Sequence, residues 1–163
     1  IIREYFVKVR QLAFDDYFFF CDEIMRDPDY PTLQIGLHDE MCHIAQSDID
    51  ALTIIPRGHL KTTLLTSYYA IWKLLHNKNL RILVASDTLD VAKQFIGEIK
   101  DHIIHNKRLK RTFPELKPAV AEGRTDFKKW TSTEILIDRT KILKEPSITA
   151  VSAGQTKSQD IFM

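Results

Sequence analysis

The sequence predicts an α/β fold in which helices flank a mainly parallel sheet and a helical segment precedes it. Apolar, β-branched runs that are typical of strands lie at residues 52–55, 80–86 and 147–152. Segments in which apolar residues recur every three or four positions, as in amphipathic helices, follow the first and the second of these runs. Because strands and helices alternate in this order, we expect a right-handed parallel βαβ unit.

Length, composition and charge restrict the class of protein. With 163 residues, 44% of them apolar, the chain can bury a core and has the size of one domain. Its formal net charge of +1 argues against a strongly basic nucleic-acid coat protein but allows local basic patches. Cys21 and Cys42 provide no disulfide framework and indicate a reducing compartment. No apolar run reaches the roughly 20 residues of a membrane span, and no secretory signal is visible.

Residues 1–46 are expected to form a helical segment that packs on a core made by residues 47–163. Apolar side chains recur at helical spacing over residues 2–26, where the pair Asp15–Asp16 predicts a bend. A second, shorter helix is expected over residues 36–46. The sequence begins without a methionine and ends within an apolar run, so we expect it to be part of a longer protein.

Metal-ligating residue types occur in the second of these helices. His38, Cys42 and His43 could suggest zinc, but the second ligand pair of a zinc site is missing from the pattern. A structural role is therefore favoured for these three side chains.

The stretch around Lys61 is the strongest candidate for a binding site. A strand is expected over residues 52–55, a proline and a glycine then break the pattern, and a helix is expected over residues 64–75. In a strand–turn–helix of this kind, the backbone N–H groups of the turn and of the helix start point at a bound anion. Lys61 adds a mobile positive charge, and the hydroxyl of Thr62 can ligate Mg²⁺. The pattern therefore predicts a phosphate-binding turn.

The match to the general pattern G-x-x-x-x-G-K-[ST] is incomplete, because Ile55 and Leu60 occupy the two glycine positions. The alternative is an ordinary loop with a chance Lys-Thr-Thr. Phosphate binding is favoured because a second feature is expected at the same edge of the sheet. Ser86, Asp87 and Thr88 follow the strand at 80–86, where Asp87 or Thr88 caps the next helix, and ligands bind beyond the carboxyl ends of parallel strands.

The C-terminal half offers weaker signals. A local basic run is interpreted either as a solvated face or as a contact to DNA phosphates; it consists of Lys107, Arg108, Lys110 and Arg111. Residues 112–129 are expected to form a surface loop, and residues 130–138 a strand. Arg139 is interpreted as a sensor, as a trans-acting arginine or as a solvent-exposed charge, and these alternatives stay open. A polar loop at 153–159 and the start of a further strand at 160–163 are expected to follow.

Two blocks of sequence resemble the ATPase domain of viral large terminases, the motors that pump DNA into procapsids. Pro56-Arg57-Gly58-His59-Leu60-Lys61-Thr62-Thr63 is similar to the deviant Walker A motif of that family. The stretch from Ile82 through Ser86-Asp87-Thr88 to Phe113-Pro114-Glu115 is similar to its second motif block. The resemblance covers roughly residues 50–155. It implies a RecA-like (ASCE) P-loop NTPase fold that couples ATP hydrolysis to the translocation of double-stranded DNA.

The resemblance assigns roles to individual residues. Lys61 would pair with the β- and γ-phosphates of ATP, Thr62 would ligate Mg²⁺, and Arg57 would act as a catalytic charge near the γ-phosphate, in the same or a neighbouring subunit. The backbone N–H groups that hold the phosphates would come from Gly58, His59, Leu60, Lys61, Thr62 and Thr63. His38 or Gln34 would contact the adenine.

The resemblance also implies partners and a location. The Walker B and catalytic acids are expected beyond Met163, so this piece should bind nucleotide weakly and hydrolyse it poorly. Double-stranded DNA, a portal protein and a small terminase subunit are the expected partners, within a homo-oligomeric ring in the cytoplasm of a bacterial host and without a membrane. Two alternatives stay open: a helicase-like ATPase that acts on nucleic acid, and a non-catalytic interaction module without nucleotide, which Leu60 supports.

Overall fold

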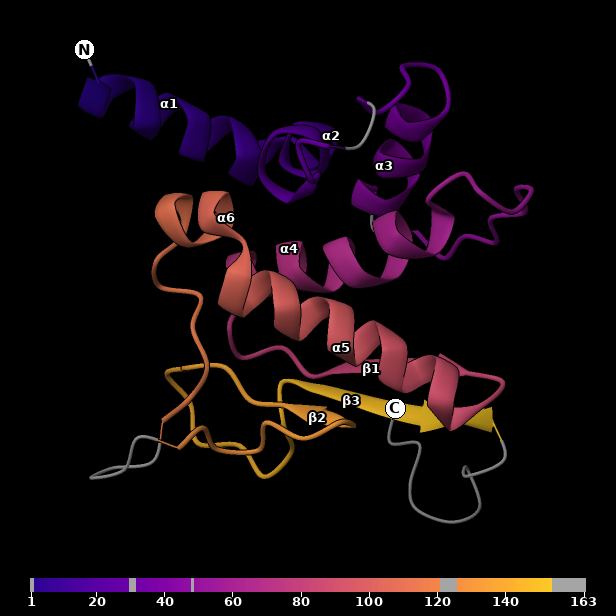
Figure 1. The fold of residues 1–163 in the computed structure, drawn as a ribbon, viewed down its shortest axis with the longest axis vertical. Coiled ribbons are helices and arrows are strands. Elements are labelled where there is room, and N and C mark those ends of the chain that lie inside the picture. The colour runs from indigo at the N-terminus through magenta and orange to yellow at the C-terminus, as the bar shows by residue number, and fades with distance from the viewer. Residues whose placement is uncertain (1, 30–31, 48, 121–125, 154–163) are drawn as a thin grey trace.

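The computed structural model describes residues 2–29, 32–47, 49–120 and 126–153. Helices form one side of the molecule and a small sheet with irregular connections forms the other (Figure 1). In chain order the elements are α1 (Ile2–Asp15), α2 (Tyr17–Phe19), the π-helix η1 (Phe20–Met25), α3 (His38–Gln46), the π-helix η2 (Thr63–Tyr68), α4 (Tyr69–His76), β1 (Ile82–Ser86), α5 (Leu89–His105), α6 (Lys107–Thr112), β2 (Glu134–Ile135) and β3 (Ile148–Ser152).

The described sheet has the strand order β1-β3-β2. β1 and β3 pair in parallel, from Ile82 opposite Ile148 to Ser86 opposite Ser152, and β2 pairs antiparallel with β3. One face of β1 is covered and the other is open, since Val84 is buried whereas Leu83 is 62% exposed. Helix α5 lies against β1 and β3 on the covered face (Figure 1).

The expected RecA-like P-loop fold is wrong. A mixed sheet of three strands is too small and too sparse in strands for that fold. The expected strand at 52–55 is not formed: residues 51–56 make no backbone-to-backbone hydrogen bond within the described chain, and Leu52 is 87% exposed. An apolar, β-branched run needs a neighbouring strand to satisfy its amides, and none lies beside this one in the described residues. The βαβ unit expected from this run is therefore missing, and the parallel pair is β1 with β3.

The N-terminal helix is broken where the sequence predicts a bend. Asp16 leaves the helical conformation, and its carboxylate accepts a hydrogen bond from the N–H of Phe19 at 3.0 Å, which caps α2. The chain then continues as the π-helix η1, and both Tyr17 and Phe20 are buried. The expected second helix is present as α3, and the helix after the Lys61 turn is present as η2 and α4.

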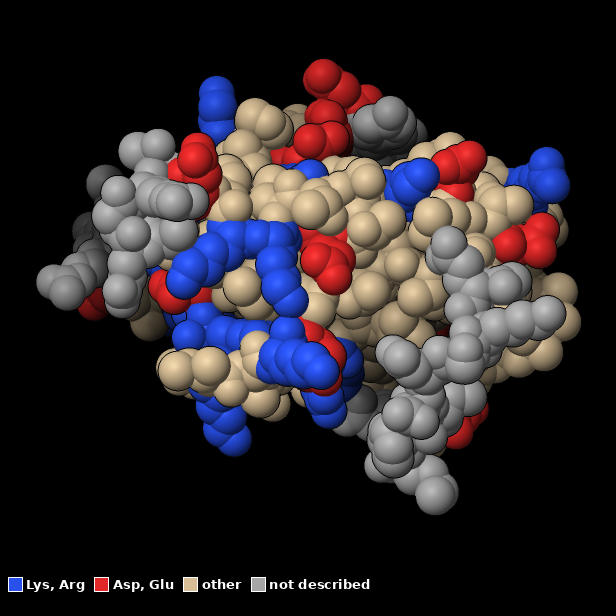
Figure 2. Space-filling model, turned by 90° about the horizontal axis from the view of Figure 1, so that it is seen from below, with Lys and Arg blue, Asp and Glu red and all other residues tan. Residues whose placement is uncertain are grey.

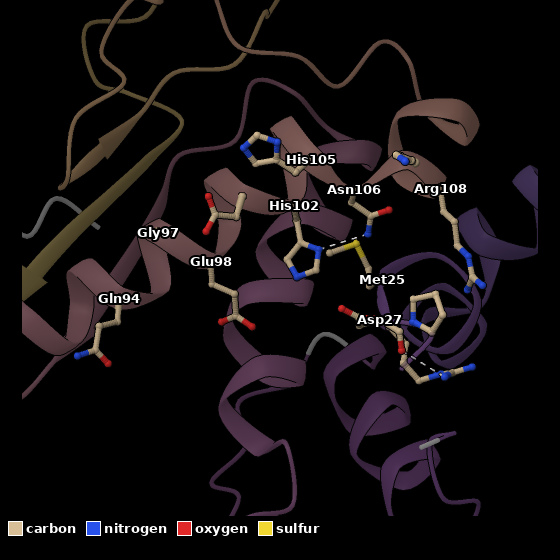
Figure 3. Close-up of a pocket in the computed structure, with 13 residues that line it drawn as sticks. Met25, Asp27, Gln94, Gly97, Glu98, His102, His105, Asn106 and Arg108 are labelled. Atoms are coloured by element: carbon tan, nitrogen blue, oxygen red, sulfur yellow. Dashed lines mark hydrogen bonds between the residues drawn. The ribbon is translucent and has the colours of Figure 1, made fainter. Parts of the chain in front are cut away.

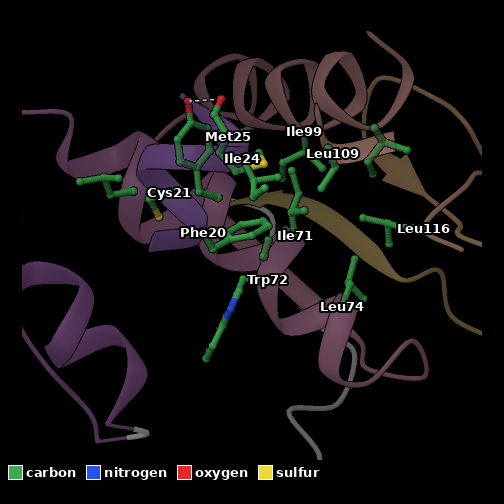
Figure 4. Packing of buried hydrophobic residues seen from close by; sticks show 14 of the residues in the cluster. Phe20, Cys21, Ile24, Met25, Ile71, Trp72, Leu74, Ile99, Leu109 and Leu116 are labelled. Atoms are coloured by element: carbon green, nitrogen blue, oxygen red, sulfur yellow. Dashed lines mark hydrogen bonds between the residues drawn. The ribbon is translucent and has the colours of Figure 1, made fainter. Parts of the chain in front are cut away.

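The hydrophobic core joins the N-terminal helices to the rest of the chain. Phe20 of η1, Ile71 of α4 and Ile99 of α5 are fully buried and meet in this core (Figure 4). The indole N–H of Trp72 donates to the carbonyl oxygen of Ala13 at 3.2 Å, and the hydroxyl of Tyr17 donates to the carbonyl oxygen of Leu64. Burial of one such side chain contributes about 1.5–3 kcal/mol. The N-terminal helices therefore hold both the start of η2, through Tyr17, and α4, through Trp72.

The sheet side is more irregular than the sequence predicts. The strand expected at 130–138 is reduced to β2, with isolated bridges that pair Trp130 with Ile135 and Pro118 with Ile137. The expected loop at 153–159, except for Ala153, and the expected strand at 160–163 lie outside the described residues. Within the described residues, no helix is both long and apolar enough to cross a lipid bilayer.

Candidate functional site

The turn from Pro56 to Thr63 encloses a cavity of about 380 Å³. Its backbone takes the left-handed conformation twice, at Gly58 with φ 89° and at Leu60 with φ 51°. Glycine adopts this conformation readily, whereas a residue with a Cβ does so at a cost of roughly 1–2 kcal/mol. Leu60 therefore has the backbone conformation that glycine favours, at the position where the general phosphate-binding pattern has a glycine.

The backbone N–H groups of this turn are free. Those of Arg57, Gly58, His59 and Leu60 donate no hydrogen bond to any described residue. Leu64, the second residue of η2, donates its N–H to the carbonyl oxygen of Leu60 at 2.9 Å. The first turn of η2 has neither a side-chain cap nor an acidic residue. Free amides at an uncapped helix start give this cavity a positive electrostatic potential.

Lys61 closes the turn. Its ammonium group donates to the carbonyl oxygen of Ile55 at 3.2 Å, and its side chain is half-buried. Arg57 and Thr62 are exposed, so the guanidinium and the hydroxyl stand at the rim of the cavity. No carboxylate is among the residues that line this cavity, and the set of donors suits an anion.

The second feature expected at this site caps a helix. Thr88, rather than Asp87, caps α5: its hydroxyl oxygen accepts from the N–H of Val91 at 3.4 Å. Within the described residues no hydrogen bond joins the Lys61 turn to Ser86–Thr88. The strand expected at 52–55, which was to bring both features to one edge of the sheet, is not formed.

His38 and Gln34 contact each other. The backbone N–H of Gln34 donates to Nδ1 of His38 at 2.8 Å, which leaves the proton on Nε2. That Nε2 atom is buried and has no hydrogen-bond partner among the described residues. Cys42 is buried as a free thiol and His43 is exposed. Within the described residues, no group of three or more metal-ligating side chains comes together.

The basic run on α6 makes contacts within the protein. The guanidinium of Arg108 donates to the carbonyl oxygen of Glu23 at 3.0 Å, and that of Arg111 lies 3.9 Å from the ring centre of Phe6. The ammonium of Lys110 donates to the carbonyl oxygen of Ile104 at 3.1 Å. Arg108, Lys110 and Arg111 therefore each contact another part of the chain, and all four residues of the run are exposed.

Arg139 binds its own loop. Its Nη2 atom donates to the carbonyl oxygens of Leu143 and Glu145, at 2.5 and 2.8 Å. The guanidinium thus closes the loop 139–145, and its Nη1 atom is buried without a partner among the described residues. Asp138, the acid beside it, pairs with Lys117 at 3.4 Å.

A larger cavity, of about 950 Å³, was not predicted from the sequence. It lies between the end of η1 and one face of α5, where Glu98 and His102 point toward Met25 and Asp27 (Figure 3). Burial lowers the pKa of His102, and the neighbouring carboxylates, Glu98 first, oppose this effect.

One wall of this cavity could have been predicted from the sequence. Its α5 residues share one helix face, at spacings of three and four; they are Gln94, Gly97, Glu98, Asp101, His102 and His105. What the sequence did not indicate is that η1 ends opposite this polar face.

No family model, curated protein or solved structure matches the chain. The function is therefore inferred from the geometry of the site and from the resemblance of its residues to a known motif.

Proposed function

We propose that the turn from Pro56 to Thr63 binds the phosphate groups of ATP. The observation that carries the proposal is the set of free backbone N–H groups in a concave turn that also presents Lys61. A phosphate would accept hydrogen bonds from these amides, as anions do at uncapped helix starts. It would also compete with the carbonyl oxygen of Ile55 for the ammonium of Lys61. The proposal rests on this turn and not on the sheet.

The residues at the rim fit a nucleotide bound with Mg²⁺. The hydroxyl of Thr62 is exposed and could supply one oxygen ligand, and Mg²⁺ takes most of its other ligands from phosphates and water. When bound, Mg²⁺ neutralises charge that develops on the transferred phosphoryl group. Arg57 is exposed and could reach the γ-phosphate in the same or a neighbouring subunit. Because no carboxylate lines the cavity, hydrolysis in this proposal depends on acids outside it.

The resemblance to large terminases supports the wider role. We propose that the chain is the ATP-binding part of a motor that translocates double-stranded DNA into a procapsid. Its partners would be DNA, a portal protein, a small terminase subunit and further copies of itself in a ring. Its location would be the cytoplasm of a bacterial host cell.

The test is nucleotide binding by Lys61→Ala, compared with Lys61→Arg and with Lys8→Ala, an exposed lysine on α1. A fluorescent ATP analogue with Mg²⁺ reports affinity, and the thermal midpoint reports binding to the native state. Loss of a charge-assisted hydrogen bond should weaken binding roughly tenfold or more in Lys61→Ala. Lys61→Arg should retain part of the affinity and Lys8→Ala all of it. Equal affinities in wild type and Lys61→Ala, or a wild-type midpoint that Mg-ATP does not raise, would contradict the proposal.

One observation favours the alternative of a non-catalytic interaction module. Leu52 and Ile54, in the segment that enters the turn, are 87% and 84% exposed, and apolar side chains exposed together often mark a protein interface. If the chain is such an interaction module, Mg-ATP should leave its thermal midpoint of unfolding unchanged. The paired substitution Leu52→Asp with Ile54→Asp would then alter self-association in analytical ultracentrifugation, and Lys61→Ala would not.

A further inference from the structure

Lysine and arginine side chains gather on one part of the sheet side of the molecule (Figure 2). The described loops there carry five exposed lysines from three segments, which we call the lysine platform: Lys117, Lys128, Lys129, Lys141 and Lys144. These residues are scattered along the sequence, so no charge run marks them. They lie on a different surface from the basic run on α6 (Figure 1).

Backbone and side-chain hydrogen bonds hold the three segments together. The N–H of Lys128 donates to the carbonyl oxygen of Ala119 at 2.8 Å, and the N–H of Asp138 donates to that of Lys117 at 2.9 Å. The ammonium of Lys129 donates to the carbonyl oxygen of Lys144 at 3.0 Å and joins the second segment to the third. The lysines therefore stand on a fixed scaffold rather than on independent loops.

Arg139 completes this scaffold. By binding two carbonyl oxygens of the loop 139–145, its guanidinium fixes the loop that displays Lys141 and Lys144. We therefore assign Arg139 a positioning role on this surface.

Most lysines of the platform form no ion pair. The acids Asp138 and Glu145 are already paired, with Lys117 at 3.4 Å and with Arg81 at 3.2 Å. The other four lysines form no ion pair within the described chain, although Lys144 still attracts the carboxylate of Glu145. This surface therefore has more lysines than paired carboxylates, while the formal net charge of the whole chain is only +1.

Apolar and aromatic side chains are interspersed with these lysines. Ile142, between Lys141 and Leu143 at the tip of the loop, is fully exposed, and Phe127, next to Lys128, is 44% exposed. Exposed rings and apolar side chains beside basic groups suit nucleic acid, because they can pack on sugars while ammonium groups contact phosphates. A simple anion would need only the charges.

We propose that the lysine platform binds the phosphate backbone of duplex DNA without reading its base sequence. The proposal rests on the proposed function for its choice of duplex DNA as the polyanion. The lysines themselves, their scaffold and their missing acid partners are independent of the Lys61 turn.

Two double variants that remove the same charge provide the test: K141Q/K144Q on the platform and K107Q/K110Q on α6. Binding of the whole chain to a short fluorescent duplex of mixed sequence is measured by anisotropy between roughly 50 and 200 mM salt. The platform variant should lose about tenfold in affinity at the middle of this range. Its plot of log affinity against log salt should become shallower by roughly 0.9 for each lysine removed. The α6 variant should match wild type, and an unrelated duplex sequence should give the same affinities.

The outcomes separate this proposal from its rivals. A platform variant that binds duplex like wild type overturns it, and a loss confined to the α6 variant moves the DNA contact to α6. If wild type binds vesicles of phosphatidylserine and phosphatidylcholine through the platform but does not bind duplex, the surface contacts membranes and the proposal is wrong. Nucleotide binding, measured on the same samples, should be equal in wild type and platform variant. Absence of nucleotide binding with retained platform-dependent DNA binding would overturn the proposed function alone.

Discussion

Two helices of this protein begin in opposite ways. At α5, Thr88 is extended, with φ −116°, and accepts a hydrogen bond from Val91, while Asp90 adds a negative charge in the first turn. At η2, the preceding turn has left-handed residues at Gly58 and Leu60, and neither a cap nor an acid follows. The start of α5 is therefore electrostatically satisfied within the chain, whereas the start of η2 keeps free donors and a positive potential.

This difference indicates where an anion would bind. Both segments follow apolar, β-branched runs, and the sequence assigned both of them to one ligand site. The structure separates them by function: Thr88 and Asp90 stabilise a helix, and the turn before η2 offers hydrogen-bond donors to a ligand. A helix start with its own cap has fewer free N–H groups that could donate hydrogen bonds to a bound phosphate.

The largest expected effect on stability comes from Gly58. No heavy atom lies within 4 Å of the position that a Cβ would occupy there, so Gly58→Ala introduces no clash. The cost is the left-handed backbone alone, about 1–2 kcal/mol in the free energy of unfolding. Chemical denaturation measures it.

Gly97 provides the matched control for this substitution. It lies inside α5 with the same open space around a Cβ but without a positive φ. Gly97→Ala should therefore stabilise the protein by about 0.5–1 kcal/mol. If both substitutions have the same sign, the turn is not held in the left-handed conformation.

Substitutions of the threonines at the two helix starts should change the free energy of unfolding by an intermediate amount. Thr88→Ala removes the acceptor for Val91 and should cost roughly 1 kcal/mol in thermal or chemical denaturation, with recovery in Thr88→Asp. Thr62 is helical and exposed, and its side chain makes no capping hydrogen bond, so Thr62→Ala should leave stability unchanged within about 0.5 kcal/mol. Under the proposed function, Thr62→Ala should weaken Mg-ATP binding and Thr88→Ala should not. The reverse pattern would remove the distinction between the two helix starts.

Strand prediction succeeded where a partner was available. The run at 80–86 became β1 because residues 148–152, far away in sequence, pair with it from Ile82 to Ser86. The run at 52–55 has similar side chains but no neighbour in the described chain, and it stays irregular and exposed. Local composition predicts that a segment favours an extended backbone, whereas the existence of a strand depends on contacts that one segment does not encode.

The candidate site shows the same limit. The sequence located the turn, its lysine and the helix after it, and the break at Asp16 also followed from local signals. It did not predict that Leu60 is left-handed, because a leucine rarely adopts that conformation. The lysine platform was missed as well, since its members come together through the bridges between residues 117–120 and 127–138 and through the bond from Lys129 to the carbonyl oxygen of Lys144.

Substitution of Leu60 should have the smallest effect on stability and a specific effect on phosphate binding. Its side chain is 41% exposed, so Leu60→Gly loses little packing. Relief of the left-handed strain, roughly 1–2 kcal/mol, is partly offset by the greater entropy of glycine in the unfolded chain. The free energy of unfolding should therefore rise by about 0.5 kcal/mol or stay level.

Phosphate affinity should respond more clearly to this substitution. A glycine in place of Leu60 keeps the conformation of the turn and removes a side chain from the rim of its cavity, so Mg-ATP should bind more tightly. Leu60→Ala is the control, because it shortens the side chain but retains the Cβ and the strain. Tighter binding in Leu60→Gly than in Leu60→Ala would attribute the effect to the backbone, and equal binding would attribute it to the side chain. Weaker binding in Leu60→Gly than in wild type would mean that this turn does not hold the phosphates.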